Sequence, residues 1–327
     1  SYFSNRQQFV KWNEACSSVV PVPYGIAQGS LVGPLIFIMY MNDIVKCSSL
    51  LRLVLYADDT NVFMETDNVN DGIVAMNREL CYLSEWLRLN SLTLNSDKLH
   101  YVIFHRKRRI PEAPRFDVVL NDIIIKRANS TKFLGVQLDD SLSFDVHVGS
   151  VVRKLSKYVP ILYNLRKFLP IEALKLIYNG IVYPNLFYCN SLWGSCAAAH
   201  IKPLLVLQKK LIRIMCSKPR MAHSAPLFKS LNILDLNEIN NYVTCSYVFK
   251  FLQNSGATEE FKIYECPYET RLSATPNLAL PPIYTTHGRQ SIRWRGPKAW
   301  NALPQDIRLA TSYDSFKLRL KKFLINQ

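Results

Sequence analysis

Two adjacent carboxylates, Asp58 and Asp59, lie between the apolar runs Leu53–Tyr56 and Val62–Phe63. Aspartate is a common turn residue, so a plain polar turn is one interpretation of the pair. In an apolar setting, neighbouring like charges also raise the free-energy cost of ionising both carboxyl groups. A divalent cation removes that cost, and hard carboxylate oxygens suit Mg²⁺. A pair of such ions would indicate phosphoryl transfer.

The segments around the pair predict the elements that position it. Residues 51–56 and 62–64 are short apolar runs, so we expect two strands joined by a tight turn that holds the Asp pair close to a dry sheet edge. A helix is expected to begin near Pro34, because proline suits the first helical turn. Another is expected over 67–89, where apolar residues recur on one helical face: Ile73, Met76, Leu80, Leu83 and Leu87.

The rest of the chain changes character near residue 143. Residues 92–104 predict two strand-like pieces around Asn95–Lys98, and 133–136 predict a short strand. Successive basic helices are expected between 143 and 216, then helices at 234–253 and 313–325 with a Pro-rich irregular stretch between them. Because hairpins and helices are mixed without strict βαβ repeats, the sequence predicts an α+β fold.

The net charge of +15 is concentrated in one part of the chain. Residues 98–220 contain 21 basic and 7 acidic side chains, whereas residues 1–97 contain 6 and 10. Such asymmetry indicates a surface that binds a polyanion, and it disfavours a charge spread evenly for solubility.

Cysteine usage and hydropathy indicate an intracellular protein. The eight cysteines form no C-x-x-C pair and are typical of buried thiols in a reducing compartment. The longest strongly apolar run, residues 31–41, is too short for a bilayer, which needs about 20 residues. No signal peptide is visible. We expect a nuclear or cytoplasmic protein that is not secreted and has no membrane partner; Arg106–Arg109 is either a nuclear-import signal or a charged loop.

Several blocks, in order, resemble one protein family. Tyr56-Ala57-Asp58-Asp59 is similar to the YxDD box of reverse transcriptases, and residues 25–44, 92–104 and 132–140 resemble the blocks that surround it in non-LTR retrotransposons. The opening SYFSNRQQFVKWN and the later WRGPKAWNALP resemble members of the jockey-like group. The resemblance implies a partial polymerase palm over 1–140, a helical thumb over 141–223 and a C-terminal region over 224–327.

The resemblance also implies roles for individual residues. Asp58 and Asp59 would bind two Mg²⁺ ions, and Lys98 would act on the triphosphate. The template base and incoming nucleotide would contact Gln28, Gly29, Ser30 and Tyr56, and the primer end would rest on Phe133, Leu134 and Gly135. Each assignment has a purely structural alternative. Residues 28–30 would form a helix-entry loop, Lys98 would be a solvated lysine, and residues 133–135 would belong to a core strand. The implied partners are an RNA template, a DNA primer and dNTPs.

The chain departs from the family pattern. Ala27 stands where relatives usually have proline, and Leu99 replaces a common threonine. The family's first catalytic block, which supplies a third carboxylate, and the fingers would precede Ser1. The only acidic residue before Gly25 is Glu14, in another context. We therefore expect a C-terminal fragment that does not polymerise alone.

The basic helices offer a second hypothesis. The resemblance to a thumb implies that five cations contact nucleic-acid phosphates: Arg153, Lys154, Lys157, Arg166 and Lys167. The structural alternative is that they form a solvated helix face. The same residues would serve a non-catalytic nucleic-acid-binding remnant, which is the alternative function.

Overall fold

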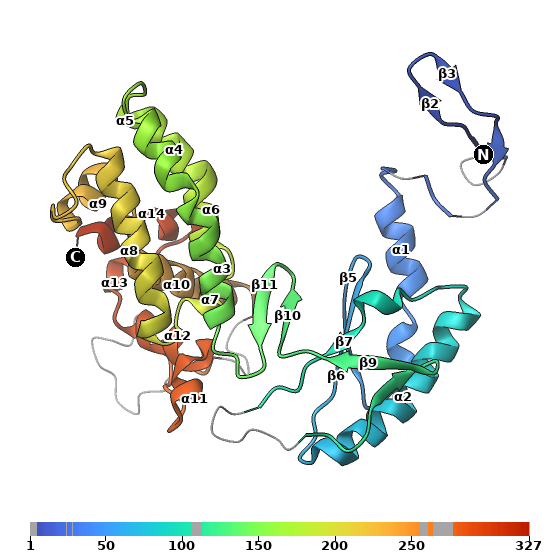
Figure 1. Cartoon of the computed structure of the whole chain (residues 1–327). Helices are drawn as coiled ribbons and strands as arrows, with labels where there is room; N and C mark the ends of the chain where they lie inside the picture. The colour runs from blue at the N-terminus through green and yellow to red at the C-terminus, as the bar shows by residue number, and fades with distance from the viewer. Residues whose placement is uncertain are drawn as a thin grey trace. The chain divides into compact units, whose positions relative to one another are not determined.

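The computed structural model describes residues 5–23, 25–27, 29–105, 113–255, 261–263 and 277–326. They form two compact units, one of residues 1–101 and 105–128, the other of residues 102–104 and 129–327. Figure 1 shows helices and small, mostly antiparallel sheets, which confirms the α+β class. Among the residues described, no helix is both long enough and apolar enough to cross a membrane.

The first unit combines short strands with two α-helices. Its elements are β1 (Gln7–Gln8), β2 (Lys11–Trp12), β3 (Ala15–Cys16), β4 (Val20–Pro21), α1 (Gly33–Met41), β5 (Arg52–Tyr56), β6 (Asp59–Phe63), α2 (Val69–Leu89), β7 (His100–Tyr101), β8 (Val118–Leu120) and β9 (Ile123–Arg127). Short 3₁₀ helices occur at Ile44–Lys46 and Ser96–Lys98. Strand β1 pairs with β4, β2 with β3 and β5 with β6, and a three-stranded sheet has the order β7-β9-β8.

Most predicted elements of this unit are present. Helix α1 has Pro34 in its first turn, and α2 follows the predicted 67–89 helix closely. The predicted strand at 92–94 is wrong, because those residues are irregular and only β7 forms after them. The side chain of Asn95 accepts a hydrogen bond from the Asp97 amide at 3.2 Å, which favours the 3₁₀ turn that interrupts the segment.

Helix α2 forms the support of the first unit. The Asn68 side chain caps it by accepting a bond from the Asn70 amide at 2.9 Å. Its apolar face is buried with residues of β8: Ile73, Leu80, Leu83, Leu87, Val118 and Leu120. Leu53, Leu55 and Val62 of the β5–β6 hairpin pack on the same cluster. The hairpin is therefore held by one apolar face.

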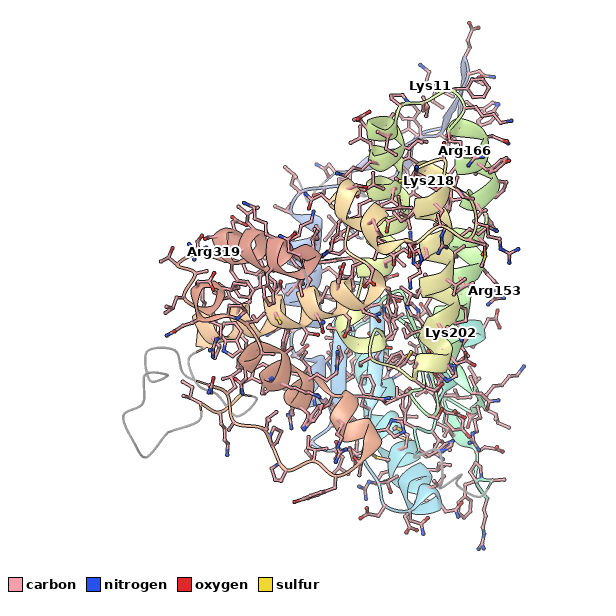
Figure 2. All side chains as sticks on the ribbon, turned by 90° about the vertical axis from the view of Figure 1, so that its left-hand side faces the viewer. Lys11, Arg153, Arg166, Lys202, Lys218 and Arg319 are labelled. Atoms are coloured by element: carbon pink, nitrogen blue, oxygen red, sulfur yellow. The ribbon has the colours of Figure 1, made fainter. Side chains whose placement is uncertain are left out.

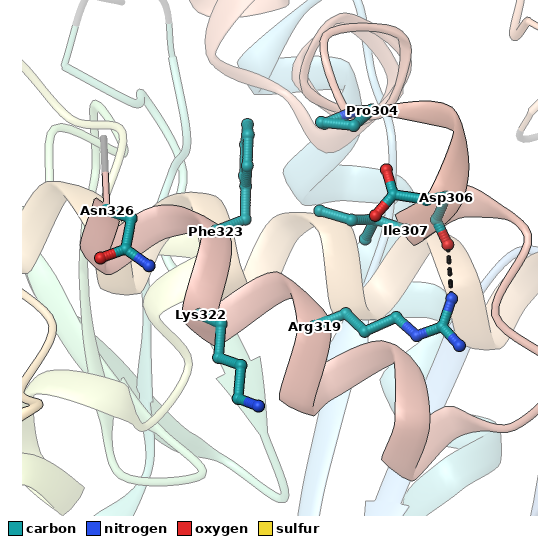
Figure 3. A pocket seen from close by; sticks show the side chains of 7 residues that line it. All are labelled: Pro304, Asp306, Ile307, Arg319, Lys322, Phe323 and Asn326. Atoms are coloured by element: carbon teal, nitrogen blue, oxygen red, sulfur yellow. Dashed lines mark hydrogen bonds between the residues drawn. The ribbon is translucent and has the colours of Figure 1, made fainter.

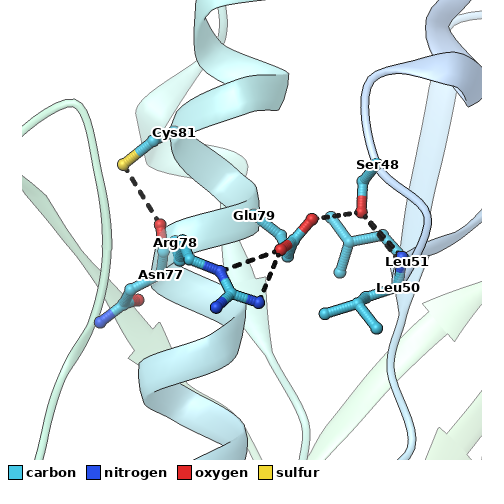
Figure 4. Close-up of polar contacts among 7 residues, drawn as sticks. All are labelled: Ser48, Leu50, Leu51, Asn77, Arg78, Glu79 and Cys81. Atoms are coloured by element: carbon cyan, nitrogen blue, oxygen red, sulfur yellow. Dashed lines mark hydrogen bonds and ion pairs between the residues drawn. The ribbon is translucent and has the colours of Figure 1, made fainter.

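A polar contact reinforces this support from α2 (Figure 4). Ser48 donates a hydrogen bond to the buried carboxylate of Glu79 at 2.7 Å and accepts bonds from the amides of Leu50 and Leu51. Arg78 pairs with Glu79 at 3.1 Å. The Ser48 bond and, after it, the Arg78 contact outweigh burial and hold the pKa of Glu79 below its ordinary value. The chain entering β5 is thus tied to α2.

The second unit is a hairpin followed by helices. Its elements are β10 (Ser130–Phe133), β11 (Val136–Asp139), α3 (Asp145–Ser156), α4 (Tyr158–Leu165), α5 (Ile171–Ile177), a π-helical turn at Tyr178–Val182, α6 (Tyr183–Phe187), α7 (Asn190–Trp193), α8 (Ala198–Met215), α9 (Ala225–Leu231), α10 (Leu236–Ser255), α11 (Thr286–Gln290), α12 (Ile292–Asn301), α13 (Gln305–Arg308) and α14 (Tyr313–Asn326).

The predicted helices of this unit are confirmed, including α10 and α14 near the C-terminus. The prediction of an irregular stretch between those two is wrong for residues 286–308, which form α11, α12 and α13. The reason is packing: Gly296, Pro297 and Trp300 of α12 are buried and belong to a helix face that joins the core. Proline content alone predicted too little structure there.

One large apolar cluster holds the second unit together. It joins α3, α8, α10 and α14 and includes the fully buried rings of Tyr178, Trp193 and Phe316. Gln208 donates to the Tyr178 hydroxyl at 2.9 Å and to the Leu234 carbonyl at 3.0 Å inside this core. The basic side chains of α3 and of the turns that flank α4 therefore rest on a well-packed support.

The Glu79 contact gives a pH-dependent prediction. Glu79→Gln removes the charge, and the unfolded carboxyl has an ordinary pKa of about 4.3. Because the folded-state pKa is lower, the stabilising contribution is complete above the unfolded pKa and is lost as pH falls through the folded one. We expect the variant to unfold at lower urea concentration than the parent at pH 7, and the difference between them to become smaller as the pH falls to about 3.

Glu85→Gln is the matched control on the same helix. Glu85 pairs with Arg88 at 2.7 Å on the surface, so its loss should shift the urea midpoint little. A difference between the Glu79 variant and the parent that persists unchanged at pH 3 contradicts the proposed charge effect.

Candidate functional site

The Asp pair lies at the tip of the β5–β6 hairpin. Tyr56 pairs with Asp59 across the two strands, so Ala57 and Asp58 form a two-residue turn. Ala57 has a positive φ of 51°, a conformation that glycine adopts more easily than alanine. The strand–turn–strand prediction is confirmed by this register. The tip gives each carboxylate access to a ligand approaching along the hairpin axis.

The expected apolar setting of the two carboxylates is wrong. Asp58 and Asp59 are both exposed, and Tyr56 is 64% exposed. Side chains alternate along a strand, so Leu53, Leu55 and Val62 are directed to the α2 core while the tip extends beyond it. Water therefore solvates both charges, and no buried repulsion has to be relieved by a cation.

The donor chemistry suits Mg²⁺ only in part. Two carboxylates at one tip are hard oxygen ligands. Within the described ranges, no group of three or more His, Cys, Asp or Glu side chains comes together in a way that could hold a metal ion. A pair of ions needs more oxygen ligands than this tip provides. Among the described residues, the tip therefore offers two oxygen-donor side chains, fewer than a two-ion site needs.

The loop before α1 has an open backbone. Gly29 has a φ of +81°, and a Cβ added there would meet no atom within 4 Å. The Ser30 hydroxyl accepts a hydrogen bond from the Val32 amide at 3.2 Å at the entrance to α1. The structure therefore leaves the backbone at Gly29 accessible to a ligand. Gln28, the other predicted residue here, lies outside the described residues.

Lys98 ends the 3₁₀ helix Ser96–Lys98 and is exposed. The cap from Asn95 fixes the turn that presents it, which gives Asn95 a positioning role that the sequence alone left unassigned. In the part of the chain that the structure describes, no ion pair joins Lys98 to Asp58 or Asp59. The site residues of the first unit thus lie on separate turns.

The predicted strand at 133–136 is in fact a hairpin turn. Phe133 ends β10 and Val136 begins β11, and the two residues pair. Leu134 and Gly135 between them have φ values of 44° and 85°, which explains the glycine. The Tyr188 hydroxyl, from the end of α6, donates to the Leu134 carbonyl at 2.5 Å, and a Cβ at Gly135 would lie 3.4 Å from the Tyr188 ring.

Asp139, next to this hairpin, is a loop cap. Its carboxylate accepts bonds from the Ser141 hydroxyl and the Ser143 amide, both at 2.8 Å, and from the Phe144 amide at 2.7 Å. Burial raises the pKa of Asp139, but these hydrogen bonds outweigh it and lower the pKa below the ordinary value. The carboxylate is therefore used in the fold, at the entrance to α3.

The predicted phosphate-binding cations lie on α3 and in the turns at the two ends of α4. Arg153, Lys154, Lys157 and Lys167 are exposed, and Figure 2 shows Arg153 and Arg166 on the surface of these helices. The guanidinium of Arg166 lies 4.1 Å from the Tyr163 ring centroid. Among the described residues, none of the five forms an ion pair with a carboxylate. They remain available to an anionic partner.

A cavity of about 410 Å³ opens between α13 and α14 (Figure 3). Asp306, Arg319 and Lys322 line it with apolar residues. Arg319 donates to the Asp306 backbone carbonyl at 2.8 Å, so part of its donor capacity is used within the wall. The cavity holds no arrangement of nucleophile, base or paired carboxylates, and we assign no chemistry to it.

Comparison with known proteins gives a family match for the segment that contains the hairpin tip. Residues 3–138 match the family described as "Reverse transcriptase (RNA-dependent DNA polymerase)". This segment contains the Asp58–Asp59 hairpin, the Gly29 loop and Lys98, so the resemblance to reverse transcriptases is confirmed for residues 3–138. The similarity to jockey and to other mobile elements supports the jockey-like character of this resemblance.

The relatives extend the similarity beyond the family segment. The chain is 29% identical over 250 residues to "Probable RNA-directed DNA polymerase from transposon X-element" and 24% identical over 248 residues to "RNA-directed DNA polymerase from mobile element jockey", both of Drosophila melanogaster. These alignments cover 74% and 73% of this chain but only 27% of each relative. The chain thus spans about a quarter of the length of these relatives. No solved structure shows significant similarity.

The contact between Tyr188 and Leu134 predicts a loss of stability in Tyr188→Phe. Removing the hydroxyl leaves the Leu134 carbonyl without this donor, and a typical cost is about 1 kcal/mol. Urea denaturation should show that decrease, and the amides of the β10–β11 turn should exchange hydrogen faster. Tyr284→Phe is the control, because Tyr284 is 86% exposed. Equal unfolding free energies for Tyr188→Phe and the parent refute a positioning role for the hydroxyl.

Proposed function

We propose that Asp58 and Asp59 bind catalytic Mg²⁺ in an RNA-directed DNA polymerase, which extends a DNA primer on an RNA template with dNTPs. The observation that carries this proposal is the YADD hairpin, whose two carboxylates are exposed at a tip inside the reverse transcriptase segment. Bound Mg²⁺ would supply charge neutralisation for nucleotidyl transfer. An exposed tip allows a nucleotide and its metal ions to reach both carboxylates.

The other site residues take supporting roles in this proposal. The open backbone at Gly29, with Gln28, Ser30 and Tyr56, contacts the template base and incoming nucleotide. Lys98 neutralises the triphosphate or protonates the pyrophosphate leaving group, roles that a mobile ammonium can fill. The Phe133–Gly135 turn, held by Tyr188, supports the primer end. These assignments correspond to a palm over 1–140, a thumb over 141–223 and a C-terminal region over 224–327.

We further propose that residues 1–327 by themselves do not polymerise, because two carboxylates make only part of a two-ion site. The expected result is no primer extension by the purified chain on an RNA–DNA template–primer with dNTPs and Mg²⁺. Asp58→Asn serves as the matched control and should give the same background. This proposal is contradicted if the parent incorporates nucleotides robustly and Asp58→Asn abolishes that incorporation.

Nucleic-acid binding without catalysis is the second candidate function for these residues. The cations on α3 and at the two ends of α4 favour it, because five of them, four exposed, occur without a carboxylate partner in the described structure. Such contacts neutralise phosphates, so affinity falls as salt rises.

The described cysteines are free thiols, which supports an intracellular compartment, nuclear or cytoplasmic.

Salt titration measures the proposed phosphate contacts. The parent chain should bind a fluorescent RNA–DNA duplex, and Lys154→Gln should weaken binding and reduce the slope of log K against log salt by about 1. Lys46→Gln, which removes an exposed charge from the first unit, is the control and should leave the slope unchanged. If Lys154→Gln and Lys46→Gln change the salt slope equally, a specific role for α3 is contradicted.

A further inference from the structure

The turn between α4 and α5, residues 166–170, presents an aromatic side chain that the core does not use. Phe168 is 80% exposed, whereas its neighbours Leu165 and Leu169 pack against the core of the second unit. Backbone bonds hold the turn, since the amides of Phe168 and Leu169 both donate to the Leu165 carbonyl, at 3.0 and 2.9 Å. The ring is therefore displayed to solvent by an ordered turn.

The surroundings of Phe168 indicate the kind of ligand. A single exposed apolar residue is ordinary on a protein surface and carries no inference alone. Here the ring follows Arg166 and Lys167, and residues 146–171 contain five basic side chains and no Asp or Glu. The Arg166 guanidinium already lies over the Tyr163 ring at 4.1 Å, while the Phe168 ring remains open. The turn, at the end of α4 in Figure 1, thus combines cations with an aromatic face.

This combination fits an unpaired nucleic-acid strand better than a duplex or a protein. The cations attract phosphates whatever the sequence. An aromatic ring stacks on a base only when the base face is free, which is the case in a single strand. An apolar protein partner would use the ring but would not explain the positive charges of Arg166 and Lys167 beside it.

We propose that Phe168, flanked by the Tyr163–Arg166 stack and Lys167, is a base-stacking site for unpaired RNA or DNA. The inference rests on the proposed nucleic-acid function and adds to it a site for the single-stranded part of the substrate. Stacking supplies affinity that does not depend on salt, and the cations supply the part that does. These two contributions can be measured separately.

The test compares Phe168→Ala and Phe168→Tyr with the parent chain. Fluorescence anisotropy gives the affinity for a 20-nucleotide single-stranded RNA, the same sequence as DNA, and a blunt duplex, at several salt concentrations. One base–aromatic stack corresponds to about a tenfold change in affinity. We expect Phe168→Ala to lose about tenfold on single strands, with the salt slope and duplex affinity unchanged, and Phe168→Tyr to bind like the parent. A loss on RNA alone or on DNA alone also supports the site and identifies its strand type.

Tyr284→Ala is the control, because Tyr284 is another exposed aromatic residue, 86% accessible, in the same unit. It should bind single strands like the parent. The stacking site is overturned if Phe168→Ala binds single strands with an affinity within twofold of the parent. That result is expected if the turn instead binds a protein partner. An equal loss on duplex and single strands also overturns it.

The proposed function fails separately from this inference. Salt-dependent duplex binding by the parent, with Phe168→Ala unchanged on every probe, leaves the phosphate contacts standing and removes only the stacking site. The absence of binding by the parent to all three probes at low salt overturns both.

Discussion

The packing of one face of the β5–β6 hairpin on α2 is the constraint on which the first unit depends. Leu53, Leu55 and Val62 are partly buried against the apolar cluster that α2 helps to form, and the bond from Ser48 to Glu79 ties the start of β5 to the same helix. A two-stranded hairpin is marginal in water without such support. Because side chains alternate along each strand, fixing the apolar face fixes the register, and the register places Asp58 at the turn and Asp59 beside it.

A different device organises the helical unit. Arg295 of α12 donates to the Gln290 carbonyl at 2.7 Å, to the Asn240 side chain at 2.9 Å and to the Ser191 carbonyl at 2.6 Å. Burial lowers its pKa to about 10. The contacts join α12 to α7 and α10, so the WRGPKAWN segment, whose cations and aromatics could suggest a ligand site, supplies a structural arginine and the buried Trp300.

The sequence predicted those helices and strands that depend on the local pattern of apolar residues and proline. The period of apolar residues gave α2, Pro34 gave the start of α1, and the two apolar runs gave the Asp hairpin. It failed where the deciding contact is distant in sequence. The turn at Leu134 and Gly135 is held by Tyr188, 54 residues away, and α12 forms because Trp300 joins a core built from other helices. The burial expected for the Asp pair was wrong because apolar flanks on one strand face say nothing about the exposure of the tip.

The exposure of Asp58 and Asp59 separates folding from metal binding in this chain. Had the pair been buried, two adjacent charges would need a cation or a proton before the hairpin could form. At a solvated tip the repulsion between them is screened, so the hairpin depends on its apolar face and on Glu79 but on no bound ion. The same exposure means that the tip alone orients a metal ion poorly, since hard cations are held firmly only where several oxygens surround them. In the proposed polymerase site, the catalytic geometry would then come from further ligand groups, while the hairpin contributes two carboxylates in a fixed register.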